Sequence, residues 1–184
     1  VVSSTMQEQM TVHLPAVDIV AGGLYGALGI PQAVVAADAD AARDRALATM
    51  GLLGIADLAA RDVMTLSTGQ ARRALIARAL VHDPEALVLD EPCTGLDPEG
   101  MFYVRRSMRA LAQAGKSIVL VTHYPEDIIP EIARLVLVKD GAVFADGPKE
   151  RLLSDDTMSA LFGGPRRVKR TAGPARAKNA EEDG

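Results

Sequence analysis

The 184-residue sequence is 48% hydrophobic, which is enough apolar side chain to bury a core, and it is expected to form one domain. Its net charge is −4, but residues 164–184 hold six basic and three acidic side chains, so the preceding part carries about −7. An acidic body argues against a nucleic-acid-binding surface, because phosphate contacts need Lys and Arg.

Cysteine content and hydropathy point to a cytosolic protein. Cys93 is the single cysteine, which excludes an internal disulfide and suits a reducing compartment. No apolar run approaches the roughly 18 to 20 residues that span a bilayer, and no secretory signal stands at the start. Val1 in place of a methionine suits a chain that begins inside a larger protein, although processing would also leave it.

The first third of the chain is expected to be mostly helical. The predicted elements are, in order, a strand end and loop over 1–10, an apolar glycine-rich stretch over 19–28, an alanine-rich helix over 38–50 and a short helix over 55–60. Asp38 or Asp40 is the predicted cap of the alanine-rich helix. Together these segments make a small helical subdomain over about residues 11–65.

From Ser67 onward helices alternate with strands. The predicted elements are a largely buried helix over 71–81, a buried strand over 86–89, a helix over 101–114, a buried strand over 117–122, a hairpin with strands 135–139 and 142–145, and an amphipathic helix over 149–162. Strands joined through helices imply parallel pairing, and Asp140-Gly141 is a strong two-residue hairpin signal. Residues 164–184 show no apolar period, which predicts a disordered tail.

Two carboxylates, Asp90 and Glu91, directly follow the first of these buried strands. The carboxyl end of a parallel strand is where such a sheet opens its ligand crevice. One carboxylate can hold a hydrated Mg²⁺, which favours one or two carboxylates plus phosphate oxygens, and the next can polarise a water molecule. The structural alternative is a strand end with two solvated acids.

Three further segments hold candidate polar groups. Ser67 is a good N-cap, and a helix that starts there presents free N–H groups to an anion, with Gly69 allowing close approach. His123 follows the strand over 117–122 and can contact a terminal phosphate or a water. Asp97 caps the helix after the turn that begins at Gly95. Taken singly, these features are equally an ordinary cap, a structural histidine and a turn.

The order of these segments carries more information than any one of them. The sequence runs from Leu-Ser-Thr-Gly-Gln over 66–70 through Arg78-Ala79-Leu80 to a strand that ends in Asp90-Glu91-Pro92, and then to Gly95-Leu96-Asp97-Pro98 and Thr122-His123. This pattern resembles the ATPase subunits of ABC transporters over residues 1 to about 163. The resemblance implies a P-loop NTPase-like α/β fold, with a parallel sheet and a helical subdomain over about 11–65, followed by a core over 66–163.

The resemblance also implies roles for individual residues. Asp90 resembles the Walker B ligand of Mg²⁺, Glu91 the general base, and His123 the switch histidine at the γ-phosphate. Asp97 resembles the D-loop residue that couples the two sites of a dimer. Ser67, Gly69 and Gln70 resemble the signature contacts to ATP bound by the opposite subunit. Thr68 replaces the commoner glycine, a mild departure from the family's pattern.

Two departures concern nucleotide binding in this chain. Ser4 stands where the family usually has a glutamine that senses Mg²⁺ and the membrane partner, with Gln7 and Gln9 as substitutes. The G-x-x-x-x-G-K-[ST] loop is absent from the printed sequence, and neither Gly22-Gly23 nor Gly163-Gly164 is followed by Lys-Ser/Thr. The phosphates of ATP therefore have no cradle within these residues, and we expect the Walker A part to lie upstream.

The expected function is that of an ATP-hydrolysing subunit, peripheral on the inner face of the cell membrane. It would work with ATP and Mg²⁺ as a homodimer, or with a second ATPase subunit, on transmembrane permease subunits, without nucleic acid. The residues around His123 and the ending Leu161-Phe162-Gly163 are most similar to those of bacterial metal-chelate or molybdate-type importers.

Three alternatives stay open at this point. The chain as printed is an inactive remnant or fragment that supplies only signature contacts, and it then has no ATPase activity alone. Alternatively, the protein is a soluble ABC protein of translation or DNA repair, although the segment between Val2 and Leu66 is too short for the coiled coil of such proteins. Finally, the basic tail touches anionic lipid or RNA rather than remaining solvated; its basic residues are Arg166, Arg167, Lys169, Arg170, Arg176 and Lys178.

Overall fold

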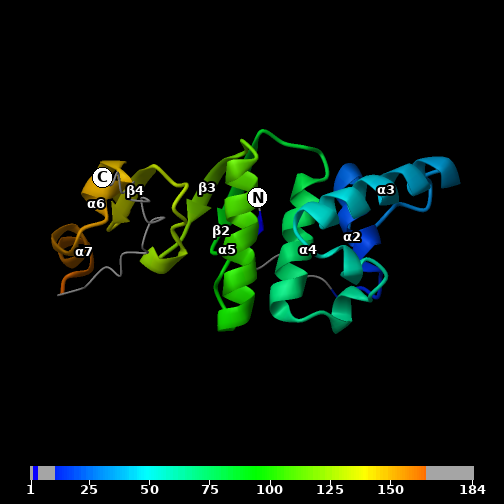
Figure 1. Cartoon of the computed structure of the whole chain (residues 1–184), viewed down its shortest axis with the longest axis horizontal. Coiled ribbons are helices and arrows are strands. Elements are labelled where there is room, and N and C mark those ends of the chain that lie inside the picture. The colour runs from blue at the N-terminus through cyan, green and yellow to red at the C-terminus, as the bar shows by residue number, and fades with distance from the viewer. Residues whose placement is uncertain (1, 4–10, 165–184) are drawn as a thin grey trace, which may run out of the picture. The chain divides into compact units, whose positions relative to one another are not determined.

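The computed structural model describes residues 2–3 and 11–164, which divide into two compact units, Val1–Glu131 and Ile132–Gly184 (Figure 1). The first unit contains every residue that the sequence analysis assigned to a site. Ser4, Gln7 and Gln9 and the tail beyond residue 164 lie outside the described residues. Within the described part of the chain, no helix is both long and apolar enough to span a membrane.

The first unit is built on a parallel sheet whose strands are β1 (Val2–Ser3), β2 (Ala86–Asp90) and β3 (Ser117–Val121), in that spatial order. The predicted parallel pairing is therefore confirmed. The register opposes Asp90 to Ser3 on one side and to Val121 on the other. All three strands end at the same edge of the sheet, so the residues that follow them are brought together.

The prediction of a fully buried strand over 117–122 is wrong. Val119 is 52% exposed and Val121 is 50% exposed. In the described part of the chain β3 pairs only with β2. Val119 and Val121 lie on the same face of β3, and the helices of this unit leave that face partly uncovered. The continuous apolar run thus reflects a strand that has room for further protein beside it, rather than one that is already enclosed.

Four helices of the first unit pack in sequence against one another. They are α2 (Ala16–Gly22), α3 (Ala36–Leu52), α4 (Thr68–Leu80) and α5 (Pro98–Gln113). Helix α2 contacts both α3 and α4, and α4 and α5 run side by side (Figure 1). As predicted, α4 is largely buried, and its buried residues include two arginines, Arg72 and Arg73.

Several predicted helix boundaries differ from the structure. Helix α3 begins at Ala36 after the extended residue Val35, so Asp38 lies in its first turn and neither Asp38 nor Asp40 caps it. The predicted helix over 55–60 is a single 3₁₀ turn, Ala56–Leu58, which follows the left-handed Gly54. Other short 3₁₀ turns are Gly23–Tyr25, Val63–Thr65 and Pro125–Asp127.

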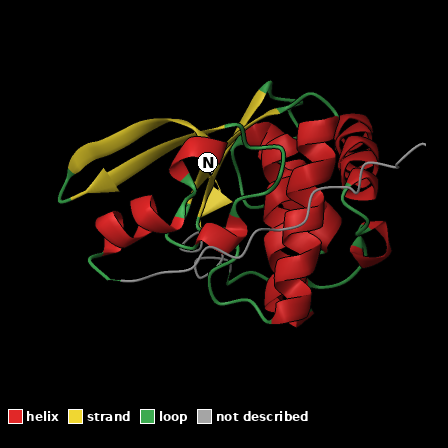
Figure 2. Cartoon of the chain, turned by 60° about the vertical axis from the view of Figure 1, so that its left-hand side comes forward, coloured by secondary structure: helices red, strands yellow, loops and turns green. Residues whose placement is uncertain are grey.

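The second unit is a hairpin followed by two short helices. Strands β4 (Arg134–Lys139) and β5 (Ala142–Pro148) pair antiparallel and are the two long adjacent arrows in Figure 2. Asp140 and Gly141 both have positive φ, 50° and 75°, as the predicted two-residue turn requires. The predicted helix over 149–162 is instead α6 (Lys149–Leu152) and α7 (Asp155–Phe162), because the Ser154 hydroxyl caps α7 by accepting from the Thr157 N–H.

A contact between two glycines sets the approach of α4 and α5. A Cβ added to Gly69 would lie 2.9 Å from the Cα of Gly100, which is closer than real Cβ atoms approach. Gly69 is buried at this contact. Its lack of a side chain is therefore explained by helix packing, whereas the sequence suggested only close approach to an anion.

We predict that Gly69→Ala lowers the free energy of unfolding by about 1–3 kcal/mol, because the two helix backbones must separate to admit the methyl group. Gly51→Ala is the matched control: it lies in α3 with no atom near the added Cβ, and it is expected to raise stability by about 0.5–1 kcal/mol. Urea unfolding followed by circular dichroism measures both. A Gly69→Ala protein as stable as the parent would contradict the packing argument.

Candidate ATP-hydrolysing site

The site is organised where β2 and β3 end. Asp90 is the last residue of β2, and the N–H of Glu91 donates to the carbonyl oxygen of Val121 at 2.8 Å. Glu91 then adopts φ of +48°, an unusual conformation for a residue with a side chain. This turn takes the chain out of the ladder directly after Asp90, so the two neighbouring carboxylates occupy different surroundings.

Glu91 and His123, which are 32 residues apart, are in direct contact. The Nδ1 atom of His123 lies 2.9 Å from Oε1 of Glu91, and the Thr94 hydroxyl donates to Oε2 at 3.2 Å. An ionised carboxylate only accepts hydrogen bonds, so Nδ1 carries the proton in this contact and Nε2 remains available to another group. Both side chains are partly exposed, which leaves the pair accessible to a ligand.

A buried ion pair holds the loop that carries His123. Asp127 is 2% exposed; its Oδ1 accepts from Nη2 of Arg105 at 2.6 Å and its Oδ2 from the Thr122 hydroxyl at 3.2 Å. The Thr122 hydroxyl also accepts from the Tyr124 N–H at 3.1 Å. These bonds brace the residues on both sides of His123 against α5. No role was predicted for Asp127, because it follows another acidic residue, Glu126, and nothing in the local pattern marks it as buried.

Ser67 and Gln70 form a capping box at the start of α4. The Ser67 hydroxyl accepts from the Gln70 N–H at 3.2 Å, and Gln70 Oε1 accepts from the Ser67 N–H at 3.0 Å. Ser67 is exposed there, so its hydroxyl proton can still be donated to a ligand. The predicted N-cap role of Ser67 is confirmed.

Asp97 caps α5, as predicted: its Oδ1 accepts from the Gly100 N–H at 2.7 Å. The Gly69–Gly100 contact brings the starts of α4 and α5 together. No interaction between described residues joins Ser67 or Gln70 to Asp90, Glu91 or His123. The structure therefore forms two groups of candidate residues, one at the strand ends and one at the two helix starts.

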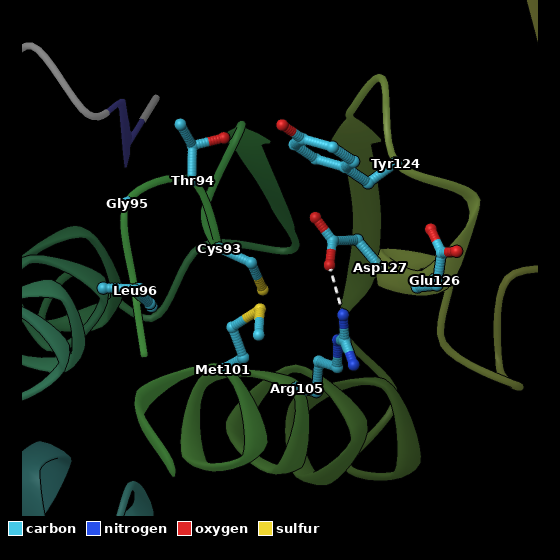
Figure 3. A pocket seen from close by; sticks show the side chains of 9 residues that line it. All are labelled: Cys93, Thr94, Gly95, Leu96, Met101, Arg105, Tyr124, Glu126 and Asp127. Atoms are coloured by element: carbon cyan, nitrogen blue, oxygen red, sulfur yellow. Dashed lines mark hydrogen bonds and ion pairs between the residues drawn. The ribbon is translucent and has the colours of Figure 1, made fainter. Parts of the chain in front are cut away.

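A cavity of about 470 Å³ opens beside the His123 loop (Figure 3). Cys93 lines it from the turn after Glu91, and the sulfur atoms of Cys93 and Met101 face each other. Burial and the nearby Asp127 carboxylate raise the pKa of the Cys93 thiol to about 12, against the smaller opposite effect of Arg105. Cys93 is thus a neutral, unreactive thiol at physiological pH.

The described residues provide no group of three or more His, Cys, Asp or Glu side chains that could hold a metal ion. This arrangement still fits Mg²⁺, because that ion is commonly bound by one or two carboxylates together with water and phosphate oxygens. Asp90 alone can supply the protein ligand of such an ion.

The candidate residues thus lie at the strand ends of a parallel sheet in an α/β unit. The sequence model of the family described as ABC transporter matches residues 2–94. The chain belongs to this family, and the predicted P-loop NTPase-like α/β fold is confirmed.

Relatives and solved structures agree with this assignment. The uncharacterized ABC transporter ATP-binding protein YlmA of Bacillus subtilis is 36% identical over 89% of this chain and 61% of its own length. Nod factor export ATP-binding protein I of Bradyrhizobium diazoefficiens is 41% identical over 55% of this chain and 34% of its own. The chain thus spans less than two thirds of these relatives.

Among solved structures, an inward-facing metal-chelate type ABC transporter aligns with a TM-score of 0.72 at 25% identity, covering 85% of this chain and 61% of that one. The structure of cbiO1 from Clostridium perfringens, part of the cbiONQ transporter complex, aligns with a TM-score of 0.65 over 84% of this chain and 59% of that one. At 24% identity, the second comparison supports the fold alone.

The raised pKa of Cys93 predicts a pH dependence of stability. Because the folded chain disfavours the thiolate, the stability that the thiol contributes is complete below the unfolded pKa, near 9, and is lost as pH rises toward 12. Over that window the free energy of unfolding should fall by about 1.4 kcal/mol per pH unit more in the parent than in Cys93→Ala. Urea unfolding under reducing conditions at several pH values measures the difference, and parallel slopes would refute it.

Proposed function

We propose that this chain forms the hydrolytic part of an ATP-binding subunit that couples ATP hydrolysis to transport by a membrane partner. The contact between Glu91 and His123 at the carboxyl ends of β2 and β3 is the observation that carries this proposal. A carboxylate with one imidazole nitrogen beside it, and the second nitrogen free, suits a water molecule attacking a terminal phosphate.

Each residue at the strand ends has a separate role in this proposal. Asp90 would hold Mg²⁺, which neutralises charge on the phosphates when it is bound. Glu91 accepts the proton of the attacking water, and Thr94 together with His123 fixes the orientation of its carboxylate. His123 donates from Nδ1 to Glu91 and, when it carries a proton on both ring nitrogens, donates from Nε2 to the terminal phosphate. Arg105 and Asp127 act indirectly, by holding the loop that carries His123.

The residues at the helix starts serve a nucleotide that another subunit binds. Ser67 and Gln70 are exposed or partly exposed at the positive end of α4, where anions are favoured, and they make no described contact with Glu91. We therefore propose that Ser67 and Gln70 contact nucleotide that is bound by a second copy of this chain or by a second ATPase subunit. Gly69 contributes its backbone, since its Cα packs on Gly100, and Asp97 keeps the start of α5 beside them.

We propose that the cradle for the phosphates is supplied by residues outside the printed sequence. The half-exposed valines of β3 and its outer edge, unpaired in the described part of the chain, offer a place for an added strand. The relatives' greater length supports such an addition.

The competing proposal is a fragment that only supplies signature contacts, which predicts no ATPase activity from the purified chain; measurable turnover would refute that version. A soluble ABC protein of translation or DNA repair is the third candidate, and nothing in the described structure favours it.

A groove on the helical subdomain is the proposed docking place of the permease. It has a volume of about 500 Å³ and is lined by the turn after α2 and the start of α3; its apolar residues include Leu24, Tyr25, Val34 and Val35, and Asp38 and Arg45 add charges. Val35 and Tyr25 are both exposed in this groove, and neighbouring exposed apolar side chains of this kind suit a protein partner. Binding here would place the protein on the inner membrane face. Relatives named for export and for import match comparably.

In the intact ATPase, we predict that Glu91→Gln reduces the rate of ATP hydrolysis by roughly 10² to 10⁴, the usual scale for losing a general base, while ATP-driven dimerisation persists. Phosphate release and size-exclusion chromatography with ATP measure the two properties. Glu99→Gln is the matched control, because Glu99 is an exposed residue in the first turn of α5 and should leave turnover unchanged. Undiminished turnover in Glu91→Gln would remove Glu91 from the mechanism.

A further inference from the structure

A further cavity, of about 280 Å³, lies between the end of α3 and one face of α5. The turn Gly51–Gly54 closes one side. The other side is the face of α5 made by Tyr103, Arg106, Ser107 and Ala110, whose spacing of three and four residues places them along a single stripe. Arg73 of α4 completes the lining. This cavity is built from residues that the hydrolytic site does not use.

Arg73 is a buried cation that lacks a hydrogen-bonding partner. Only 9% of the residue is exposed, and none of the described residues accepts a hydrogen bond from its guanidinium, whose Nε is fully enclosed. The ring of Tyr103 lies 4.7 Å from its Cζ and covers one face. The ring fixes the guanidinium plane but cannot satisfy its N–H groups, which need acceptors in that plane.

The charges around the cavity favour an anion. Arg106 adds a second positive side chain, and no acidic residue lines the space. Burial lowers the pKa of Arg73, and the carboxylates of Asp57 and Glu99 offset this only partly and through space. Burial of a guanidinium without a hydrogen-bonded counter-ion is unfavourable, and a bound oxyanion would supply the missing acceptors.

We propose that this cavity binds a small oxyanion of the phosphate class, held by the guanidinium groups of Arg73 and Arg106. Two guanidinium forks match the several oxygens and double charge of phosphate. The cavity, of about 280 Å³, has room for such an anion. The bound anion would join the end of α3 to α4 and α5. This site is independent of the proposed ATP hydrolysis.

Phosphate titration of the 184-residue chain, followed by amide NMR at constant ionic strength without nucleotide or Mg²⁺, tests the site. We expect saturable shifts of the Gly54 and Ser107 amide signals. Arg106→Gln should weaken binding about tenfold or more, the scale for losing a charge-assisted hydrogen bond. Arg106 is exposed, so this variant should fold, whereas Arg73→Gln is interpreted only if its spectrum shows a folded chain.

Two further variants separate a specific site from general electrostatic attraction. Arg109→Gln removes a charge one turn away on α5 that pairs with Glu131 instead, and it should bind phosphate like the parent. Asp57→Asn removes a competing negative charge and should tighten binding severalfold, an effect that misfolding cannot imitate. The proposal is overturned if phosphate causes no saturable shift, if Arg106→Gln and Arg109→Gln weaken binding equally, or if the shifts centre on residues 67–70 at the start of α4.

Discussion

The hydrogen bond from the Glu91 N–H to the Val121 carbonyl is the constraint on which the rest of the site depends. It is the last link between β2 and β3, and it fixes Glu91 in a left-handed conformation immediately after Asp90. Because β2 and β3 are parallel and in register, the residue that follows β3 by two positions, His123, comes within 2.9 Å of the Glu91 carboxylate. Sheet register therefore determines the spacing of the chemical groups.

Helix packing complements the sheet. Gly69 and Gly100 allow α4 and α5 to approach closely, and each helix begins with its own side-chain cap, Ser67 or Asp97. From the same α5, Arg105 reaches Asp127 and thereby steadies the His123 loop. Helix α5 thus begins at the helix-start group and, through Arg105 and Asp127, holds the loop that carries His123, so a displacement of α5 would alter both places.

Elements whose signal is local were predicted well from the sequence. The strand predicted over 86–89, the Asp140-Gly141 turn and the caps Ser67 and Asp97 depend on short-range patterns, and the structure contains all of them, with the strand extending to Asp90. The break at Ser154 was missed although its cap is also local, because the apolar period continues across it. The exposure of Val119 was missed because burial depends on what else packs there, which one strand's composition does not encode.

Long-range pairings were the least predictable part of the site. The assignment of Asp90, Glu91 and His123 came from the order of motifs, whereas the contacts that support them, Thr94 to Glu91 and Arg105 to Asp127, carry no sequence signature. The missing side chain of Gly69 was expected to allow close approach to an anion, and in the structure it also allows close approach to Gly100 of α5. Buried partners of this kind become visible only when the tertiary structure places their elements together.

We propose that Glu91 and His123 act as one unit in ATP hydrolysis. A double-mutant cycle with Glu91→Gln and His123→Gln, measured as kcat of the intact ATPase, tests this coupling. Strong non-additivity is expected: each single variant loses most of the rate, and the double variant is scarcely slower than the worse single one. Losses that multiply in the double variant would show that the two residues act independently and would contradict the proposed coupling.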